Sequence, residues 1–253
     1  MPVRREFAPR SLGAADVNAG RVEPHYARTL ARLLAAHAMA EKLTAFGYER
    51  ALETVRDNAL RPAIEKNCIQ ERGHARLLYR VLEEIGVSQQ LADRSMIAVV
   101  RAPSFEAPMY FAQHADGELD LLMASLALDT GGRLMIGINY KDSSYAPHAR
   151  AADLILEEEA GHDLFASEQL AIAAERFGRK RVNAALRAWI PRAVNFFGPP
   201  GSGFSYDCLR YGLKVRDNQE IADLYLTMVE RRCDQLGLKM PRLTREYPRA
   251  AAS

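Results

Sequence analysis

Two short stretches of the sequence each place a glutamate and a histidine three residues apart within a helical pattern. In "CIQERGHARLL" they are Glu71 and His74, and in "LILEEEAGHDLF" they are Glu159 and His162. Residues three apart lie on one face of a helix, so each pair can present a carboxylate and an imidazole to one metal ion. One such pair is weak evidence. However, this chain has only 6 histidines, and two of them stand three residues after a glutamate in the middle of a helical pattern.

A fixed offset links the two pairs to two further acids. The second pair follows the first by 88 residues, and Glu41 lies 30 residues before Glu71. At the same distance before Glu159 stands Asp129, within the apolar stretch "LLMASLALDT". An acid in such an apolar helix is costly to bury without a counter-ion. The matched spacing therefore predicts that these acids are metal ligands, rather than a helix-surface pair and a kink residue.

This set of side chains matches the ligands of ferritin-like carboxylate bundles. There, two helices each give one carboxylate and the other two each give Glu-x-x-His, all pointing inward. Four carboxylates balance the charge of two divalent ions. Oxygen-rich ligands with one imidazole per metal favour iron over zinc, and manganese is the alternative. The predicted ligands of the two ions are Glu41, Glu71, His74, Asp129, Glu159 and His162.

Other side chains near these positions are assigned lesser roles. His37 lies one turn before Glu41, and we expect it at the edge of the core rather than in the cavity. Tyr48 and Tyr79 could store a radical, but we interpret them as core aromatics. Alternative acids are Glu118, Asp120, Glu157 and Glu158. We expect the last two to be solvated or in outer contact with the ligands. The histidines given no role are His25, His114 and His148.

The elements that must position these groups are long helices, because no segment shows sustained alternation. Proline near the start and glycine past the end mark several of them. The predicted fold is all-α, a ferritin-like four-helix bundle with additional C-terminal helices. The expected helices cover about 24–55, 59–85, 108–138, 147–177, 179–197, 205–213 and 218–238, with a shorter helical piece and a proline-punctuated connection within 88–109. The expected divisions are an N-terminal arm or mobile lead-in at 1–22, the bundle with its extension at 23–240, and a loose tail at 241–253.

Composition excludes several classes of protein. The chain has 253 residues, 48% of them hydrophobic, and a formal net charge of +2, which is too small to argue for nucleic-acid binding. The 3 cysteines form no C-x-x-C pair, so neither a zinc cage nor a disulfide framework is indicated. The N-terminus has no apolar signal core, and we expect no run of membrane-spanning length. We predict a cytoplasmic protein.

With these residues in hand, the chain resembles the phenylacetic acid catabolic family of ferritin-like proteins over about residues 25–235. The ligand pattern matches that of the family's catalytic subunits, including an aspartate in the third position. The stretch "RAVNFFGPPGSG…YGLKVRDNQEI" is similar to the segment that follows their bundle. The resemblance implies a coenzyme A thioester substrate, a non-catalytic ferritin-like partner and a separate electron-donating reductase, and hence a homo- or hetero-oligomer. The N-terminal arm has no match in that pattern.

The leading hypothesis is a non-haem di-iron oxygenase that inserts one oxygen atom into an organic substrate. The candidate cations for thioester phosphates are Arg179, Lys180, Arg181, Arg192, Lys214 and Arg216. Two alternatives stay open. One is a di-iron hydroxylase of tRNA or of a carrier-bound amine, and the other is a non-catalytic iron-binding ferritin-like protein.

Overall fold

The computed structural model describes the backbone of residues 3–243, and the side chains of that range except those of 159–169. The described part is all-α and contains no strand, with one isolated bridge between Leu12 and Tyr145. The helices of the bundle region are α1 (Ala14–Asn18), α2 (Pro24–Thr54), α3 (Arg61–Glu83), α4 (Gln89–Met96), α5 (Glu106–His114), α6 (Glu118–Ala124), α7 (Thr130–Leu134) and α8 (Ala146–Phe177). Those that follow are α9 (Arg179–Phe196), α10 (Gly203–Arg210) and α11 (Asn218–Gln235).

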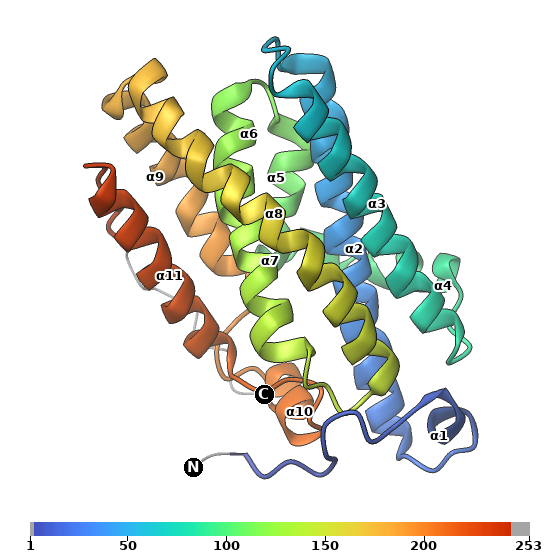
Figure 1. The fold of residues 1–253 in the computed structure, drawn as a ribbon. Helices are drawn as coiled ribbons and strands as arrows, with labels where there is room; N and C mark the ends of the chain where they lie inside the picture. Colours follow the sequence, from blue (N-terminus) through green and yellow to red (C-terminus); the bar gives the residue numbers. More distant parts are fainter. Residues whose placement is uncertain (1–2, 244–253) are drawn as a thin grey trace.

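Four long helices form the bundle. They are α2, α3, α8 and one composite helix in which α6 and α7 continue into each other (Figure 1). The composite helix contains two π-helical turns, Ser125–Asp129 and Met135–Tyr140. The segment between α3 and α6 includes α4, two 3₁₀ turns and α5, and it supplies the crossover between the two helix pairs. The predicted four-helix bundle with C-terminal helices is therefore confirmed.

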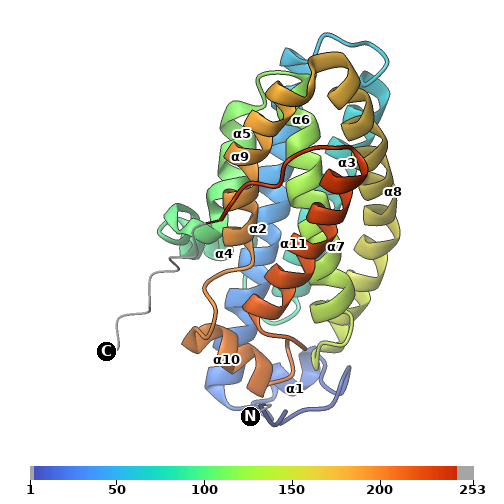
Figure 2. The ribbon, with the colours of Figure 1, turned by 90° about the vertical axis from the view of Figure 1, so that its left-hand side faces the viewer.

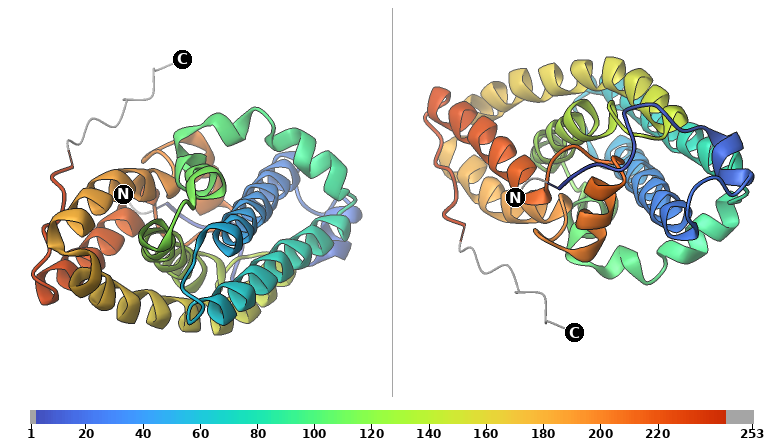
Figure 3. Two further views of the ribbon diagram at one scale, coloured as in Figure 1. Left: turned by 90° about the horizontal axis from the view of Figure 1, so that it is seen from above. Right: turned by 90° about the horizontal axis from the view of Figure 1, so that it is seen from below.

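The C-terminal helices cover one side and one end of the bundle. Figure 3, which views the molecule from above and below, shows α9 and α11 stacked beside the composite helix. Contacts of α9 with α5, α6 and α8, and of α11 with α7 and α9, agree with this view. Figure 2 shows α10 at the same end of the molecule as α1. The chain after α9 thus reaches this end of the bundle at α10, and α11 then runs back along the bundle.

Several helix ends coincide with prolines and glycines in the sequence. Pro24 occupies the first turn of α2, and Pro62 does the same in α3, where the missing N–H costs no hydrogen bond. Past the ends of α3 and α8, Gly86 and Gly178 each have a φ of 79°. This left-handed region is unfavourable for other residues, so the two glycines allow the chain to leave the helix.

The single helix expected at 108–138 is interrupted. Helix α5 ends at His114, and α6 begins only at Glu118. The break is held by the C-terminal part of α2, where Arg50 pairs with Asp116 and the Thr54 hydroxyl donates to the carbonyl of Ala115. Farther on, the paired glycines do not end the helix as their low propensity would suggest. The expected start of this helix at residue 108 was wrong, because these polar contacts hold a break between α5 and α6.

The composite helix also contains a more apolar run than expected. Residues Glu118–Tyr140 contain an 18-residue window of mean hydropathy 1.4, which meets the length and composition of a membrane span, so the expectation that no run reaches this length was wrong. However, 72% of that window is buried inside the protein. Such a helix at the centre of a bundle has the composition of a core helix.

The arm expected at 1–22 packs, from residue 3 onward, across the end of the bundle. Backbone N–H groups of Arg10 and Leu12 donate to the carbonyls of Ser143 and Ser144 at 2.8 and 2.9 Å. Phe7 also packs edge-on against Tyr26, with ring centroids 5.2 Å apart. This segment therefore closes one end of the structure. Of the tail expected at 241–253, residues 244–253 lie outside the described part.

Candidate metal centre

Two adjacent helices bring together the first three predicted ligands. Glu41 lies on α2, and Glu71 and His74 lie one turn apart on α3. All three are buried, with exposed fractions of 8%, 2% and 4%. One carboxylate oxygen from each acid and one imidazole nitrogen lie within 4.8 Å of one another. This cluster has the donors and the spacing to hold a metal ion.

The imidazole of His74 connects three carboxylates. Its Nδ1 atom lies 3.6 Å from Oε2 of Glu41 and 3.8 Å from Oε2 of Glu71. On the other side, Nε2 lies 3.0 Å from Oε2 of Glu158, which comes from α8. An outer carboxylate of this kind fixes the orientation of a ligating imidazole and raises its basicity. Glu158 therefore contacts the predicted ligand His74 from outside the cluster, which is one of the two roles expected for it.

His37 lines the cavity, so the expectation that it lies at the core edge was wrong. Its Nε2 atom is 2.9 Å from Oε1 of Glu41, and its Nδ1 is 3.4 Å from Nε2 of His148. The ring of Tyr140 lies against both imidazoles, with centroid distances of 5.1 and 4.9 Å. The sequence signal for His37 is its position one turn before Glu41. We find no such signal for His148, because its partner is far away in the chain.

Asp129 points into the same interior. It is 2% exposed, lies on the first π-helical turn, and lines the cavity that Glu41 and Glu71 also line. The hydroxyl of Tyr48 donates to it at 3.0 Å, and the hydroxyl of Ser125 donates as well. π-helical turns often occur at functional sites, because the extra residue turns a side chain away from its α-helical direction. Asp129 lies in the site but is not part of the three-residue cluster.

The other two predicted ligands are not described. Glu159 and His162 lie on α8, but their side chains are outside the described residues. The backbone of α8 contacts both α3 and the π-helical turn that carries Asp129. Their role as ligands stays a prediction.

Electrostatics separate the two clustered acids. Burial opposes ionisation of Glu41, but hydrogen bonds with His37 and His74 outweigh it and hold the pKa of Glu41 well below its ordinary value. Burial, together with the neighbouring charge of Glu41, raises the pKa of Glu71 well above its ordinary value. Two acids this close thus differ in their affinity for a proton when no cation lies between them.

The remaining candidates have other partners. Glu118 pairs with Arg176 at 2.9 Å, and Asp120 accepts a hydrogen bond from the indole of Trp189 at 3.4 Å. Tyr79 donates to Asp93 on α4. Tyr48 is different, since it contacts Asp129 and also accepts from Asn67 at 3.2 Å. Of the two tyrosines, the one that touches a predicted ligand is therefore Tyr48.

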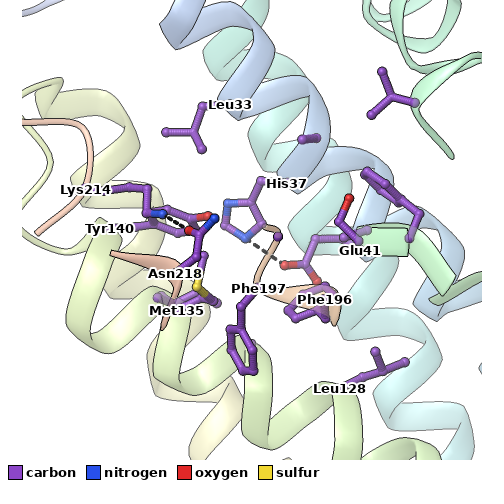
Figure 4. Close-up of a pocket in the computed structure, with 18 of the residues that line it drawn as sticks. Leu33, His37, Glu41, Leu128, Met135, Tyr140, Phe196, Phe197, Lys214 and Asn218 are labelled. Carbon is purple, nitrogen blue, oxygen red and sulfur yellow. Dashed lines mark hydrogen bonds and ion pairs between the residues drawn. The ribbon is translucent and has the colours of Figure 1, made fainter. Parts of the chain in front are cut away.

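A cavity of about 250 Å³ adjoins the cluster. Glu41, Glu71 and Asp129 form part of its wall, and most of the other lining side chains are apolar. Figure 4 shows His37 and Glu41 beside Phe196 and Phe197, which come from the end of α9. Other apolar lining residues are Leu33, Met96, Val99, Phe105, Leu128, Met135, Ile136 and Phe204. An apolar cavity with a few convergent polar groups is the usual form of a small-molecule site.

Comparison with known proteins agrees with this site. A family model described as phenylacetic acid catabolic protein matches residues 22–249. The chain belongs to the phenylacetic acid catabolic protein family. A search of curated proteins finds no significant match. The family match covers the bundle and the C-terminal helices, so it includes all the residues of the site.

The residues fit a metal of the kind associated with di-iron enzymes in this family. Two buried carboxylates and one imidazole within ligand distance provide an oxygen-rich donor set with one nitrogen. Among the described residues none of the three cysteines contributes, since each is a buried free thiol outside this cluster. The cluster could therefore hold a metal ion, and its donors are hard ligands rather than the sulfur set of a structural zinc site.

Proposed function

We propose that this chain is a non-haem di-iron oxygenase. Glu41, Glu71 and His74 would largely hold one iron, and Asp129, Glu159 and His162 the other, with some carboxylates bridging. Manganese is the alternative metal. The observation that carries the proposal is the buried cluster of two acids and a histidine in the wall of an apolar cavity, in a chain of the phenylacetic acid catabolic protein family.

The roles of the metal and of the protein side chains follow from that arrangement. Bound iron would supply the activation of O₂ and the transfer of one oxygen atom to an organic substrate. The protein's own contribution is position and exclusion of water. His37 and His74 hold the carboxylate of Glu41 from two sides, at 2.9 and 3.6 Å. Tyr48 and Ser125 hold Asp129 in the same way, and the phenylalanines of the cavity keep its interior dry.

The substrate class that we propose for this oxygenase is an aromatic acyl thioester of coenzyme A. Support comes from the description of the family and from an apolar cavity large enough for a small aromatic group. We further propose an electron-donating reductase as partner, a cytoplasmic location, and assembly with like or unlike chains. Binding of nucleic acid or of a membrane is not part of the proposal.

Metal analysis provides the first test. The purified protein is expected to contain about two irons per chain. Glu71→Ala and His162→Ala are each expected to lose iron and to lower the melting temperature of the iron-loaded protein, because a bound ligand stabilises the folded state. Glu65→Ala is the matched control, since Glu65 lies on the exposed face of the same helix, paired with Arg61. Zinc alone, or an iron content unchanged by both ligand variants, would contradict the proposal.

Turnover provides the second test. With an electron donor, O₂ and phenylacetyl-coenzyme A, mass spectrometry is expected to show a product heavier by one oxygen atom. Co-purifying RNA with salt-sensitive binding would favour the tRNA alternative instead. Hundreds of irons per assembly would favour a non-catalytic storage protein.

A further inference from the structure

A buried lysine lies in the wall of the same cavity. Lys214 is 3% exposed and belongs to the segment between α10 and α11. Lysine is among the residues least often buried without a partner, because its ammonium group loses strong hydration. Burial lowers the pKa of Lys214, as this loss of hydration requires. Its position therefore needs a physical explanation.

The surrounding groups fix the direction of the ammonium group. Its Nζ donates to Oδ1 of Asn218 and lies 3.4 Å from the hydroxyl of Ser205. Asn218 cannot turn its amide away, because its Nδ2 atom donates to the carbonyl of Pro199 at 2.9 Å. The segment itself is held by Asn139, whose Oδ1 accepts from the next two backbone N–H groups at 3.2 and 2.8 Å. Lys214 is thus a rigidly placed donor.

The positive charge lacks a direct counter-ion. Among the described residues, no carboxylate lies within ion-pair distance of Nζ of Lys214. Asp217 acts on it from beyond ion-pair distance, and its carboxylate accepts from the hydroxyl of Ser205 at 3.0 Å. The other cation in the cavity wall, Arg32, is exposed, and its guanidinium lies 4.5 Å from the ring centroid of Phe204. An ammonium has three donors, and the hydrogen bonds in the described part use two of them.

Lys214 and the acidic cluster face the same cavity from different sides. Figure 4 shows Lys214 and Asn218 on one side of the His37 ring and Glu41 on the other. The His37 ring lies between them, and the cavity wall also includes apolar side chains such as Met135 and Leu33. The cavity therefore offers a hydrogen-bond donor with positive charge at one side, a largely apolar wall beside the His37 ring, and the candidate metal cluster at the other side.

We infer that Lys214 positions the substrate by donating a hydrogen bond to an acyl oxygen, so that the apolar body of the substrate lies toward Glu41 and Glu71. The ligand class is a small apolar acid derivative whose acyl oxygen belongs to a carboxylate or to a thioester carbonyl. This inference rests on the proposed function, because it assigns the orientation of the substrate in that site. It also distinguishes Lys214 from the other cations considered for phosphates, because Lys214 alone among them is buried.

Ligand binding to the metal-loaded protein tests the inference without turnover. The probes are ethylbenzene, phenylacetate and the phenylacetyl thioester of N-acetylcysteamine, and dissociation constants are measured by calorimetry. Wild-type protein is expected to bind at least one acyl probe about tenfold or more tightly than ethylbenzene, as a hydrogen bond to a charged group allows. Lys214→Met is expected to remove this preference and to leave the affinity for ethylbenzene within about twofold. The acyl probe that binds more tightly identifies the acyl group.

A matched control removes the same charge from the same segment. Arg216 is exposed and pairs with Glu220 at 3.7 Å, so Arg216→Met is expected to keep the wild-type preference. If Lys214→Met does not fold, Lys214→Gln removes the charge and keeps a polar side chain beside Asn218. Repeating the titrations after chelation separates the sites, because a carboxylate bound to the metals would lose affinity whereas one bound at Lys214 would keep it.

Two results would overturn the inference. One is wild-type protein that binds ethylbenzene as tightly as both acyl probes. The other is a folded Lys214 variant with an unchanged preference, which would leave Lys214 as a structural tie between α10 and α11. Both comparisons can also be made after chelation and neither needs oxygenation, so failure of this inference and failure of the proposed function remain distinguishable.

Discussion

The buried imidazole of His148 predicts a specific loss of stability in acid. This side chain is fully buried on α8, and its Nδ1 atom has no hydrogen-bond partner among the described residues. Burial, with a smaller contribution from the neighbouring His37, lowers the pKa of His148 from 6.5 to about 3. The ring of Tyr140 covers another side of it. His148 therefore has to be neutral in the folded state.

The sign and size of the effect follow from this shift. Below its unfolded pKa of 6.5, the unfolded chain binds a proton at this residue that the folded chain does not bind. Stability is thus lost as the pH falls from about 6.5 towards 3. Between pH 7.5 and pH 5.0 the loss is about 2 kcal/mol, because each pKa unit is worth about 1.4 kcal/mol.

Urea denaturation at pH 7.5 and pH 5.0 measures this loss of stability. The experiment uses wild-type protein and His148→Phe, which keeps a ring against Tyr140, in the presence of a chelator so that acid release of metal does not contribute. The difference in free energy of unfolding between the two proteins should change by about 2 kcal/mol between the two pH values, to the disadvantage of the wild type in acid. The control is His114→Phe, an exposed histidine that also packs on a tyrosine ring.

A difference between wild type and His148→Phe that stays constant to within about 0.5 kcal/mol across this range would refute the reasoning. It would mean that the imidazole is protonated in the folded state, or that the folded state admits water to it. Other groups titrate over the same range, but they are common to both proteins and cancel in the comparison.

Three further predictions concern the bundle. Glu71→Gln should reduce iron bound per chain at least severalfold while circular dichroism keeps the helical signal; undiminished iron would contradict its role as a ligand. Gly47→Ala should destabilise the protein by about 1–3 kcal/mol in urea denaturation, since a Cβ there would overlap the ring of Phe111, and an unchanged midpoint would show that this ring moves away freely. Tyr48→Phe should cost about 1–3 kcal/mol by removing a donor to Asp129, whereas a more stable variant would show that this hydrogen bond is dispensable.

Much of the fold could be predicted from the sequence, because local signals mark the long helices. Proline in the first turn marked the starts of α2 and α3, and glycine just past the end marked the ends of α3 and α8, each to within a few residues. The interruption between α5 and α6 could not be predicted in this way. It depends on contacts of Arg50 and Thr54 with residues some sixty positions later, and no local pattern reports them.

The candidate site shows the same division. Glu71 and His74 meet because their spacing matches one turn of a helix, so sequence reasoning reaches them directly. The duplicated offset also placed Asp129 in the interior. From the sequence, His148 received no role and Lys214 only that of a candidate cation for phosphates. Each reaches the site through tertiary packing, His148 through α8 and Lys214 through the segment after α10. Residue type and spacing alone cannot indicate such neighbours.

The two π-helical turns in the composite helix have a consequence for recognising the duplication. Each turn inserts an additional residue into the helical ladder, at Ser125–Asp129 and again at Met135–Tyr140. A helical wheel drawn at a constant angle per residue therefore goes out of phase twice along this element, whereas the corresponding helix α2 stays in phase. If the two halves arose by duplication, the spacing of a few polar side chains would show it. A comparison of the apolar faces of their helices would not.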